Sequence, residues 1–467
     1  MALTNTSTKG RVPTGFADEI AISETSFRSA HRSIESNQGP PNKKRKREGK
    51  GDSGVVYGAS AYKGPWAKYE EEQPDASSGS EEEVEVEYEE DEILPNPVAA
   101  PSKAGTAYQE ISAEKETTEF HGSQQYDYQG RTYMHVPQDL NIDLKGDLSD
   151  IKNFVPKKVI HTYKSHTANI TQMRFFPSSG HLLLSASADT KIKIWDVYHQ
   201  RELLRTFSGH TKSVSDIVFS TSGAQFLSSS YDRTIKLWDT ETGSCISRFP
   251  LNATPHCLAY HPTTSEFLAG MSDKKILQFD PRTPTLGSKD ADRDIAKPVQ
   301  EYDHHLGPVN SLIWYDENRR FLSTSDDRSL RAWEYNIPVP IKFIADPSMF
   351  ALVRGAPHPS GKYVAYQSGD NQVVVYSVGE KVRLNRKKGF RGHNTAGTAV
   401  ELDISPDGGL LASGDSGGFV VFWDWKTGKL VQKIKASEGV VTGVRWHPRE
   451  TSKVVTAGQD GSIKYWD

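Results

Sequence analysis

The chain has 467 residues and a formal net charge of -4, so its overall charge does not single out a nucleic-acid binder. A hydrophobic fraction of 36% and a mean hydropathy of -0.61 are low for a compact enzyme of this length, which predicts a sizeable polar segment outside any core. The only two cysteines, Cys245 and Cys257, exclude a disulfide framework and a cysteine-based zinc site. Because the chain has no run of about 18 apolar residues and its first residues have no apolar core, we expect neither a membrane span nor a secretory signal.

The first 155 residues predict a long, largely disordered arm. Nine of the twelve residues from 81 to 92 are Glu or Asp, and like charges at this density resist compaction. Ser77, Ser78 and Ser80 precede this acidic tract in a context that suits acid-directed kinases. A basic run upstream is typical of a nuclear localisation signal, with nonspecific anion binding as the alternative, so we expect the protein in the nucleus. The residues of this run are Lys43, Lys44, Arg45, Lys46 and Arg47.

Two aromatic islands, residues 56–69 and 124–140, interrupt the polar arm. Aromatic residues are scarce in chains that only solvate, so their clustering indicates segments that become ordered on a partner. The alternative is that they pack on the folded part of the same chain. We favour docking to other molecules, with the anchors Tyr57, Tyr62, Trp66, Tyr69, Tyr126, Tyr128 and Tyr133.

From residue 156 to 467, short apolar runs alternate with Gly, Asp, Ser and Asn turn clusters, which predicts an all-β domain of short antiparallel strands. One unit recurs seven times, with endings such as KIKIWD, TIKLWD and SIKYWD. The position of its Trp, here called the Trp slot, falls at residues 195, 238, 279, 333, 376, 423 and 466, at spacings of 43, 41, 54, 43, 47 and 43. Repeats of this length ending in Trp-Asp resemble the WD40 family, whose fold is a β-propeller of four-stranded blades. The resemblance implies a seven-bladed WD40 β-propeller after the arm.

A polar register accompanies the Trp slot. Asp stands six residues before the slot in six of the seven repeats, Ser or Thr ten residues before it in five, and His 28 to 30 residues before it in four. In the WD40 family the Asp orients the His, the His bonds the Ser or Thr, and that hydroxyl reaches the indole N–H, which satisfies buried polar groups. We therefore interpret these histidines as structural rather than catalytic. The network is expected to be complete in the first, second and fourth repeats, at His166, Ser185, Asp189, Trp195, His210, Ser228, Asp232, Trp238, His305, Ser323, Asp327 and Trp333.

The order of segments within the repeat predicts how the ring closes. Residues 157–166 form a lone outer strand ahead of the first inner strands, and the last repeat stops at Asp467 without an outer strand. An open ring would leave a strand edge exposed, which favours aggregation. We expect residues 159–163 to pair with residues 462–466 and close the propeller.

No motif in the chain predicts catalysis. GDSGG, at residues 414–418, matches the segment around the nucleophile of trypsin-like serine proteases, but in the repeat register Ser416 falls in an ordinary turn. No P-loop, dinucleotide fingerprint, HExxH or paired Cys/His set occurs. We predict a non-enzymatic protein with no catalytic residue, cofactor, metal or small-molecule substrate.

One basic patch stands out, at the hairpin expected between the fifth and sixth blades. It suits RNA phosphate or an acidic partner, and a solvated hairpin is the alternative. Its residues are Lys381, Arg383, Arg386, Lys387, Lys388 and Arg391. Residues 281–299, which lengthen the interval before Trp333, are interpreted as a loop insertion.

Segments outside the repeat pattern carry a more specific resemblance, among them GASAYKGPWAKY, YDYQGRTYMHVPQD and WHPRETSKVVTAGQDGSIKYWD. With these, the chain resembles the WD40-repeat family of second-step pre-mRNA splicing factors, over both islands and the whole propeller. The resemblance implies a nuclear, non-enzymatic component of the catalytically activated spliceosome that favours the second transesterification, exon ligation. It also implies contacts with the central scaffold protein, other spliceosomal proteins and the U2/U6/U5 small nuclear ribonucleoprotein assembly, with direct RNA contact left open.

A substrate receptor of a cullin-type ubiquitin ligase is the alternative from a different class. FDPR, at residues 279–282, approximates the WDxR ending by which such receptors dock their adaptor, with Phe279 in place of Trp. Co-purification of spliceosomal RNAs, or of adaptor and cullin, distinguishes the two functions.

Overall fold

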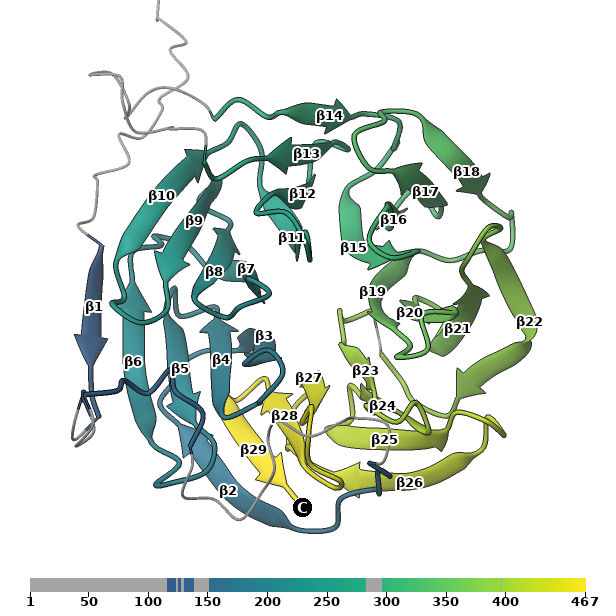
Figure 1. The fold of residues 1–467 in the computed structure, drawn as a ribbon. Helices are drawn as coiled ribbons and strands as arrows, with labels where there is room; N and C mark the ends of the chain where they lie inside the picture. The colour runs from purple at the N-terminus through teal and green to yellow at the C-terminus, as the bar shows by residue number, and fades with distance from the viewer. Residues whose placement is uncertain (1–115, 123–124, 127–129, 138–150, 283–295, 396) are drawn as a thin grey trace, which may run out of the picture. The chain divides into compact units, whose positions relative to one another are not determined.

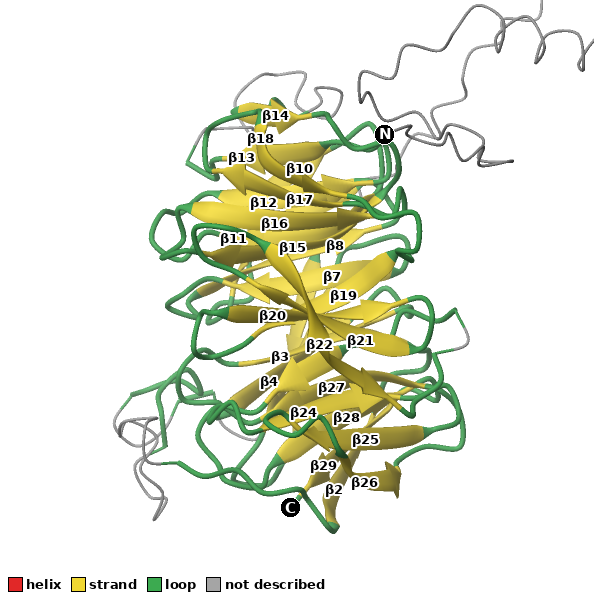
Figure 2. Cartoon of the chain, turned by 90° about the vertical axis from the view of Figure 1, so that its right-hand side faces the viewer, coloured by secondary structure: helices red, strands yellow, loops and turns green. Residues whose placement is uncertain are grey.

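The computed structural model describes residues 116–122, 125–126, 130–137, 151–282, 296–395 and 397–467, all within one compact unit, Ser102–Asp467. Every regular element in these ranges is a β-strand (Figure 2). The same ranges contain no helix long and apolar enough to cross a membrane.

The strands form seven sheets arranged in a ring (Figure 1). Blade one contains β3 (Ile170–Phe175), β4 (Leu182–Ser187), β5 (Ile192–Asp196) and β6 (Leu203–Ser208). Blade two contains β7 (Val214–Phe219), β8 (Gln225–Ser230), β9 (Thr234–Asp239) and β10 (Cys245–Pro250). Blade three contains β11 (Pro255–Tyr260), β12 (Phe267–Met271), β13 (Ile276–Phe279) and β14 (Gln300–Tyr302). Blade four contains β15 (Val309–Tyr315), β16 (Arg320–Ser325), β17 (Leu330–Glu334) and β18 (Pro340–Ile344).

Blade five contains β19 (Leu352–Pro357), β20 (Tyr363–Ser368), β21 (Gln372–Ser377) and β22 (Arg383–Arg391). Blade six contains β23 (Leu402–Ile404), β24 (Leu410–Gly414), β25 (Phe419–Asp424) and β26 (Leu430–Lys435). Blade seven contains β27 (Val441–Trp446), β28 (Val454–Gly458), β29 (Ser462–Trp466) and, as its outer strand, β2 (Val159–Lys164). The seven-bladed all-β propeller expected from the repeats is confirmed.

The ring is closed by two segments from opposite ends of the propeller sequence. Strand β2 pairs antiparallel with β29, in a register that places Val159 opposite Trp466 and Tyr163 opposite Ile463. The Asp467 amide also donates to the Lys158 carbonyl at 2.8 Å. Blade seven therefore has four strands like the other sheets of the ring, and β29 is paired on both of its sides.

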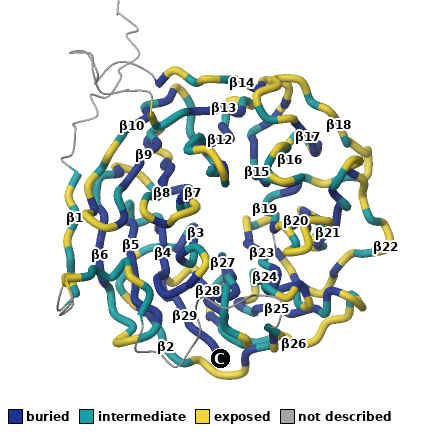
Figure 3. Tube along the Cα trace, viewed as in Figure 1, coloured by how far each residue is buried: buried dark blue, intermediate teal, exposed yellow. Residues whose placement is uncertain are grey.

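The hydrophobic core is divided among the interfaces between blades. One cluster, for example, packs Leu184 and Ile194 of blade one against Ile217 and Phe226 of blade two. Because the middle strands are covered on both faces, they read as apolar runs rather than as alternating patterns, and all six residues of β4 are buried. The outer strands face solvent, as the exposed stretches of β18, β22 and β26 show (Figure 3).

The Asp before the Trp slot has a turn-forming role in most repeats. Its carboxylate accepts the backbone N–H two residues later, as Asp189 does from Lys191 at 3.0 Å. The residue after this position, which is Gly417 instead of Asp in blade six, adopts a positive φ in all seven blades, at Thr190, Arg233, Lys274, Arg328, Asn371, Gly418 and Gly461. Since only glycine reaches this conformation without strain, the hydrogen bond from the backbone to the Asp helps to hold the turn in blades one to four, whereas Asp370 of blade five accepts the Gln372 side chain instead.

The folded part begins earlier than the boundary expected at residue 156. Strand β1 (Thr117–Phe120) adds to the outer edge of β6 as a fifth strand of blade one, with Thr117 opposite Ser208. Asn153 also binds the propeller, because its amide donates to Asp407 Oδ2 at 2.9 Å. The boundary was placed too late because these contacts depend on single polar residues and on a four-residue strand with no apolar pattern.

Candidate interaction surfaces

Blade one shows how the polar register of the repeat is satisfied. Burial lowers the pKa of His166, so its ring is neutral at neutral pH. Its Nδ1–H donates to Asp189 Oδ2 at 2.8 Å, and its Nε2 accepts the Ser185 hydroxyl at 2.8 Å. The Ser185 oxygen in turn accepts the Trp195 Nε1–H at 2.8 Å. The same chain of contacts occurs in blades two and four, at His210, Asp232, Ser228 and Trp238 and at His305, Asp327, Ser323 and Trp333.

Blade six satisfies its tryptophan differently, and blade seven keeps the contact between its tryptophan and the hydroxyl of the register. In blade six the Trp423 indole N–H donates to the Arg391 carbonyl at 2.9 Å, and His393 contacts Gln367 Oε1 of blade five at 2.9 Å. In blade seven the Trp466 N–H donates to the hydroxyl of Thr456 at 2.9 Å. A sequence match to the repeat therefore does not guarantee the same hydrogen bonds.

A second set of histidines joins consecutive blades, and sequence reasoning missed it. His447, in the loop between β27 and β28, donates through Nε2–H to the Gly180 carbonyl of blade one at 3.1 Å. Its Nδ1 accepts the backbone N–H groups of Arg449 and Glu450, both at 3.1 Å. Burial lowers the pKa of His447 to about 3, which keeps Nδ1 free to accept. A Cβ at residue 180 would lie 2.4 Å from His447 Nε2, so this close approach requires glycine.

Two further histidines make the same connection elsewhere in the ring. His261 of blade three contacts the Asn318 carbonyl of blade four, and His358 of blade five contacts the Gly408 carbonyl of blade six, both at 3.2 Å. Each ring accepts backbone N–H groups of its own loop through Nδ1. All three histidines precede a proline, so a recurring His-Pro pair was the available signal.

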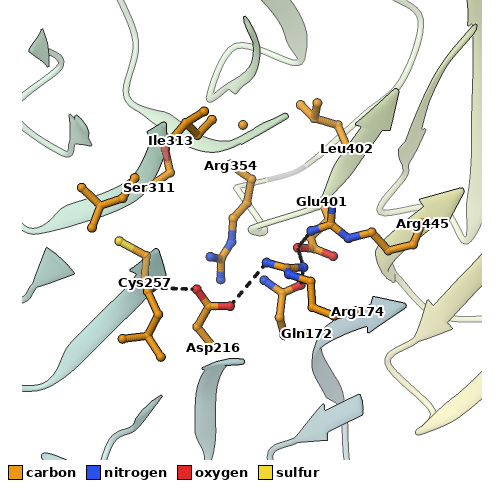
Figure 4. A pocket seen from close by; sticks show the side chains of 13 residues that line it. Gln172, Arg174, Asp216, Cys257, Ser311, Ile313, Arg354, Glu401, Leu402 and Arg445 are labelled. Carbon is orange, nitrogen blue, oxygen red and sulfur yellow. Dashed lines mark hydrogen bonds and ion pairs between the residues drawn. The ribbon is translucent and has the colours of Figure 1, made fainter. Parts of the chain in front are cut away.

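Charged side chains from five blades meet in a pocket where the innermost strands converge (Figure 4). Glu401 accepts Arg174 Nη1 at 3.1 Å and Arg445 Nη2 at 2.7 Å. Arg174 also lies 3.5 Å from Asp216 Oδ1. Burial by itself raises the pKa of Glu401, but Arg445, Arg174 and Arg354 together hold it below its usual range. The cluster ties blades one, two, six and seven by ion pairs.

The residues of this pocket fit a structural role, in which ion pairs hold neighbouring blades together. Cys257 lines it, but burial raises the pKa of this thiol to about 12, so it is not a thiolate at neutral pH. Among the described residues, no group of three His, Cys, Asp or Glu side chains is arranged to hold a metal ion. Sequence reasoning missed the pocket, because its charges come from strands far apart in the chain.

The second aromatic island partly packs on this chain's own propeller. The Tyr133 hydroxyl donates to the Thr240 carbonyl at 2.5 Å and accepts Arg205 Nε at 3.0 Å. The Arg205 guanidinium also lies over the rings of Phe120 and Tyr133, at 5.5 and 5.8 Å. Burial raises the pKa of Tyr133 to about 12. The docking role expected of Tyr133 is therefore wrong, because blades one and two already use its ring and its hydroxyl, whereas Tyr126 is 57% exposed.

Glu116, immediately before β1, holds this part of the arm on blade two. Its carboxylate pairs with Lys236 at 3.0 Å and with Arg248, both on blade two. Burial by itself raises the pKa of Glu116, but the hydrogen bonds from Arg248 and Lys236 lower it overall. Glu116 therefore connects blade two with β1 of blade one.

The basic patch lies along a strand and not at a hairpin. Five of its six residues belong to β22, the outer strand of blade five, which pairs with β21 from Ser377–Arg383 to Gln372–Arg391. The hairpin prediction was wrong because the run RLNRKKGFR is too polar to read as a strand, although an outer strand needs few apolar residues. Lys388 Nζ packs 4.5 Å from the centre of the Trp425 ring. We call the set the basic strip: Lys381, Arg383, Arg386, Lys387, Lys388 and Arg391.

Other residues singled out from the sequence fall into two groups. Ser416 lies in the turn between β24 and β25, where its amide donates to the Asn394 carbonyl at 2.7 Å. In the FDPR segment Phe279 is buried, and Arg282 Nη2 donates to Ser265 Oγ at 2.8 Å. The rest lie outside the described residues: Lys43, Lys44, Arg45, Lys46, Arg47, Tyr57, Tyr62, Trp66, Tyr69, Ser77, Ser78, Ser80, Tyr128 and residues 283–295.

Comparison with known proteins identifies the family. The model of the WD domain, G-beta repeat, matches residues 157–196, 201–239 and 296–334. Human pre-mRNA-processing factor 17 is 47% identical over 427 residues, which cover 91% of this chain and 70% of the human protein. The Saccharomyces cerevisiae pre-mRNA-processing factor 17 is 37% identical over 406 residues, 86% of each chain. The chain belongs to the pre-mRNA-processing factor 17 family.

Similarity to the pre-mRNA-processing factor 17 family extends beyond the propeller. The human match covers 91% of the chain, more than the repeats alone, so it includes part of the arm. Mouse WD repeat-containing protein 25 is less similar, at 26% identity over 322 residues. The model of the anaphase-promoting complex subunit 4 WD40 domain matches residues 358–449, within the later blades. The resemblance noted from the sequence to this splicing-factor family is confirmed.

Proposed function

We propose that this member of the pre-mRNA-processing factor 17 family is a non-enzymatic scaffold in the catalytically activated spliceosome, acting in the nucleus to promote exon ligation. The observation that carries the proposal is the 47% identity over 427 residues to a human protein named for pre-mRNA processing. The propeller supports a scaffolding role, since polar networks inside three blades and ion pairs between blades hold its surface rigid. Its proposed partners are the central scaffold protein, other spliceosomal proteins and the U2/U6/U5 assembly.

A splicing reaction in nuclear extract tests this function directly. Removal of the protein should leave the first step intact, so that the free upstream exon and the lariat intermediate accumulate while ligated exons disappear. Recombinant full-length chain should restore ligation. A block before the first step, or normal ligation after complete removal, would contradict the second-step role.

The arm is proposed to anchor the scaffold through aromatic residues. We expect Trp66→Ala with Tyr69→Ala to weaken co-purification with splicing complexes, because a segment that orders on binding depends on a few aromatic anchors. The melting temperature of the propeller should not change. Recovery of the complexes at the level of the unmodified chain would count against the anchor role.

The ubiquitin-ligase alternative is tested by the same purification. Recovery of U2, U5 and U6 RNAs supports splicing, whereas recovery of an adaptor and a cullin without these RNAs supports a substrate receptor. The FDPR segment favours the receptor only weakly, since its Phe279 is buried and its Arg282 is engaged by Ser265.

A further inference from the structure

An exposed apolar surface lies on the outside of blade four. Large hydrophobic side chains are exposed at five positions between residues 337 and 350, on β18 and its flanking loops. Contiguous exposed apolar side chains on a folded domain mark binding sites, because water contact with them is unfavourable. We call this set the apolar strip: Ile337, Val339, Ile341, Phe343 and Phe350.

The apolar strip coincides with an outer strand edge. Strand β18 is the last strand of its sheet, so within the described residues its outer side has no strand partner. Blade one shows what such an edge accepts in this fold, because β1 adds antiparallel to the outer strand β6. An edge strand offers unpaired backbone N–H and C=O groups that bind an extended peptide, with side-chain contacts providing specificity.

The basic strip borders the apolar strip. Strands β18 and β22 are the outer strands of neighbouring blades and lie next to each other on the rim (Figure 1). Arg386 Nη2 lies 3.9 Å from Asp346 Oδ2, which links the strand β22 to the loop after β18. In the described part of the chain, no ion pair engages the side chains of Lys381, Arg383 or Lys387, all of which are exposed.

We propose that β18 and the basic strip form one docking surface for an extended acidic peptide of a partner protein, in which acidic and apolar residues alternate. The peptide adds to the free edge of β18, its apolar side chains cover the apolar strip, and its carboxylates face the basic strip. Single-stranded RNA fits this surface less well, because it binds through phosphates and through stacking of bases on aromatic rings. Three of the five residues of the apolar strip are aliphatic and offer no such ring.

The test uses purified full-length chain and a fluorescent, acetylated peptide of alternating glutamate and valine, followed by fluorescence anisotropy. We expect saturable binding, which Val339→Ser with Ile341→Ser weakens about tenfold or more, because two partly exposed aliphatic contacts are lost. Arg383→Glu with Lys387→Glu should weaken it similarly, and the loss should shrink as salt increases. Both pairs of residues are exposed, so unchanged melting temperatures will show that the fold is kept.

Matched controls carry the same chemistry elsewhere on the rim. Val159→Ser with Ile246→Ser removes exposed apolar side chains, and Lys158→Glu with Lys164→Glu reverses exposed charges. Both controls should bind the peptide as the unmodified chain does. A peptide N-methylated at every residue should bind about tenfold more weakly or worse, since neither of its edges can donate backbone N–H groups to a strand.

Three outcomes would overturn the proposal. The first is equal peptide affinity for the Val339→Ser, Ile341→Ser variant and the unmodified chain. The second is an oligouridine that binds the chain with the same sensitivity to both docking-surface variants, which would assign the surface to RNA. The third is self-association of the chain, measured by sedimentation, that the Val339→Ser, Ile341→Ser variant abolishes, which would assign the surface to a second copy. The splicing assay described above is independent of all three, because it uses no peptide.

Discussion

Buried indole N–H groups decide which of the recurring serines stabilise the propeller. In blade one the Ser185 oxygen accepts the Trp195 N–H and its hydroxyl reaches His166, so one small side chain satisfies two buried neighbours. Ser413 occupies the equivalent position in blade six, but Trp423 donates to the Arg391 carbonyl instead. The repeat pattern is the same at both serines, whereas the energetic role differs.

Ser185→Ala should therefore lower the free energy of unfolding by roughly 2 kcal/mol, because the Trp195 N–H loses its acceptor inside the core. Ser413→Ala is the matched control and should cost clearly less, since its hydroxyl donates only to the Gly414 carbonyl. Both values come from denaturant titrations. Equal losses for the two variants would contradict the assigned role of the Trp–Ser–His chain.

At the scale of the element, the arm segment on blade one is held by few contacts. Strand β1 has only four residues, none fully buried, and its sheet is already complete without it. Glu116, immediately before β1, contributes ion pairs to Lys236 and Arg248. The sequence did not predict this strand, because TTEF has no apolar alternation, and its position depends on an edge that exists only after blade one has folded.

Glu116→Ala should increase amide hydrogen exchange of β1 by roughly 10- to 100-fold, since loss of charge-assisted hydrogen bonds costs roughly 1.5–3 kcal/mol. Glu119→Ala in the same strand is the control, because the Glu119 side chain is 77% exposed. The melting temperature of the propeller should stay nearly unchanged in both variants. Unaltered exchange of β1 in Glu116→Ala would show that strand pairing alone holds the segment.

At the scale of the whole propeller, stability depends on the seam where blade seven meets blade one. The hydrogen bond from His447 to Gly180 crosses this seam, and the pairing of β2 with β29 completes blade seven beside it. His447 contributes to the seam as a neutral ring, because protonation of Nδ1 would end its acceptance of the Arg449 and Glu450 amides. Its pKa of about 3 in the folded chain lies below the ordinary value of 6.5.

The propeller should lose stability as the pH falls below about 6, because the unfolded chain then binds a proton that folded His447 does not. This contribution is fully present above pH 6.5 and is lost progressively towards pH 3, at up to about 1.4 kcal/mol per pH unit. His447→Gln should make the slope of unfolding free energy between pH 6 and pH 4.5 shallower, while His304→Gln, at an exposed site, should leave it unchanged. Identical slopes for His447→Gln and the unmodified chain would rule out this acid sensitivity.

The sequence by itself determined the number of blades, the strand order and the register of the polar network. These features repeat at a nearly constant spacing, and each repeat needs the same apolar and turn residues to fold as one blade. The spacing of the repeats predicts only those structural features that all the repeats have in common. It could not show that Trp423 finds a different acceptor, because that choice depends on the neighbouring blade.

Only the tertiary structure decided which surfaces of the propeller are exposed and available to a binding partner. From the sequence we expected the side chains of Tyr133 and Lys388 to contact partners. In the structure Tyr133 packs on blades one and two, and Lys388 packs on the Trp425 ring. The charged pocket formed only when strands distant in the chain came together, and the apolar strip is exposed because β18 is the outermost strand of blade four. The physical reason is that periodicity reports contacts within a repeat, whereas exposure and ion pairing depend on what the neighbouring blades bring to the same place.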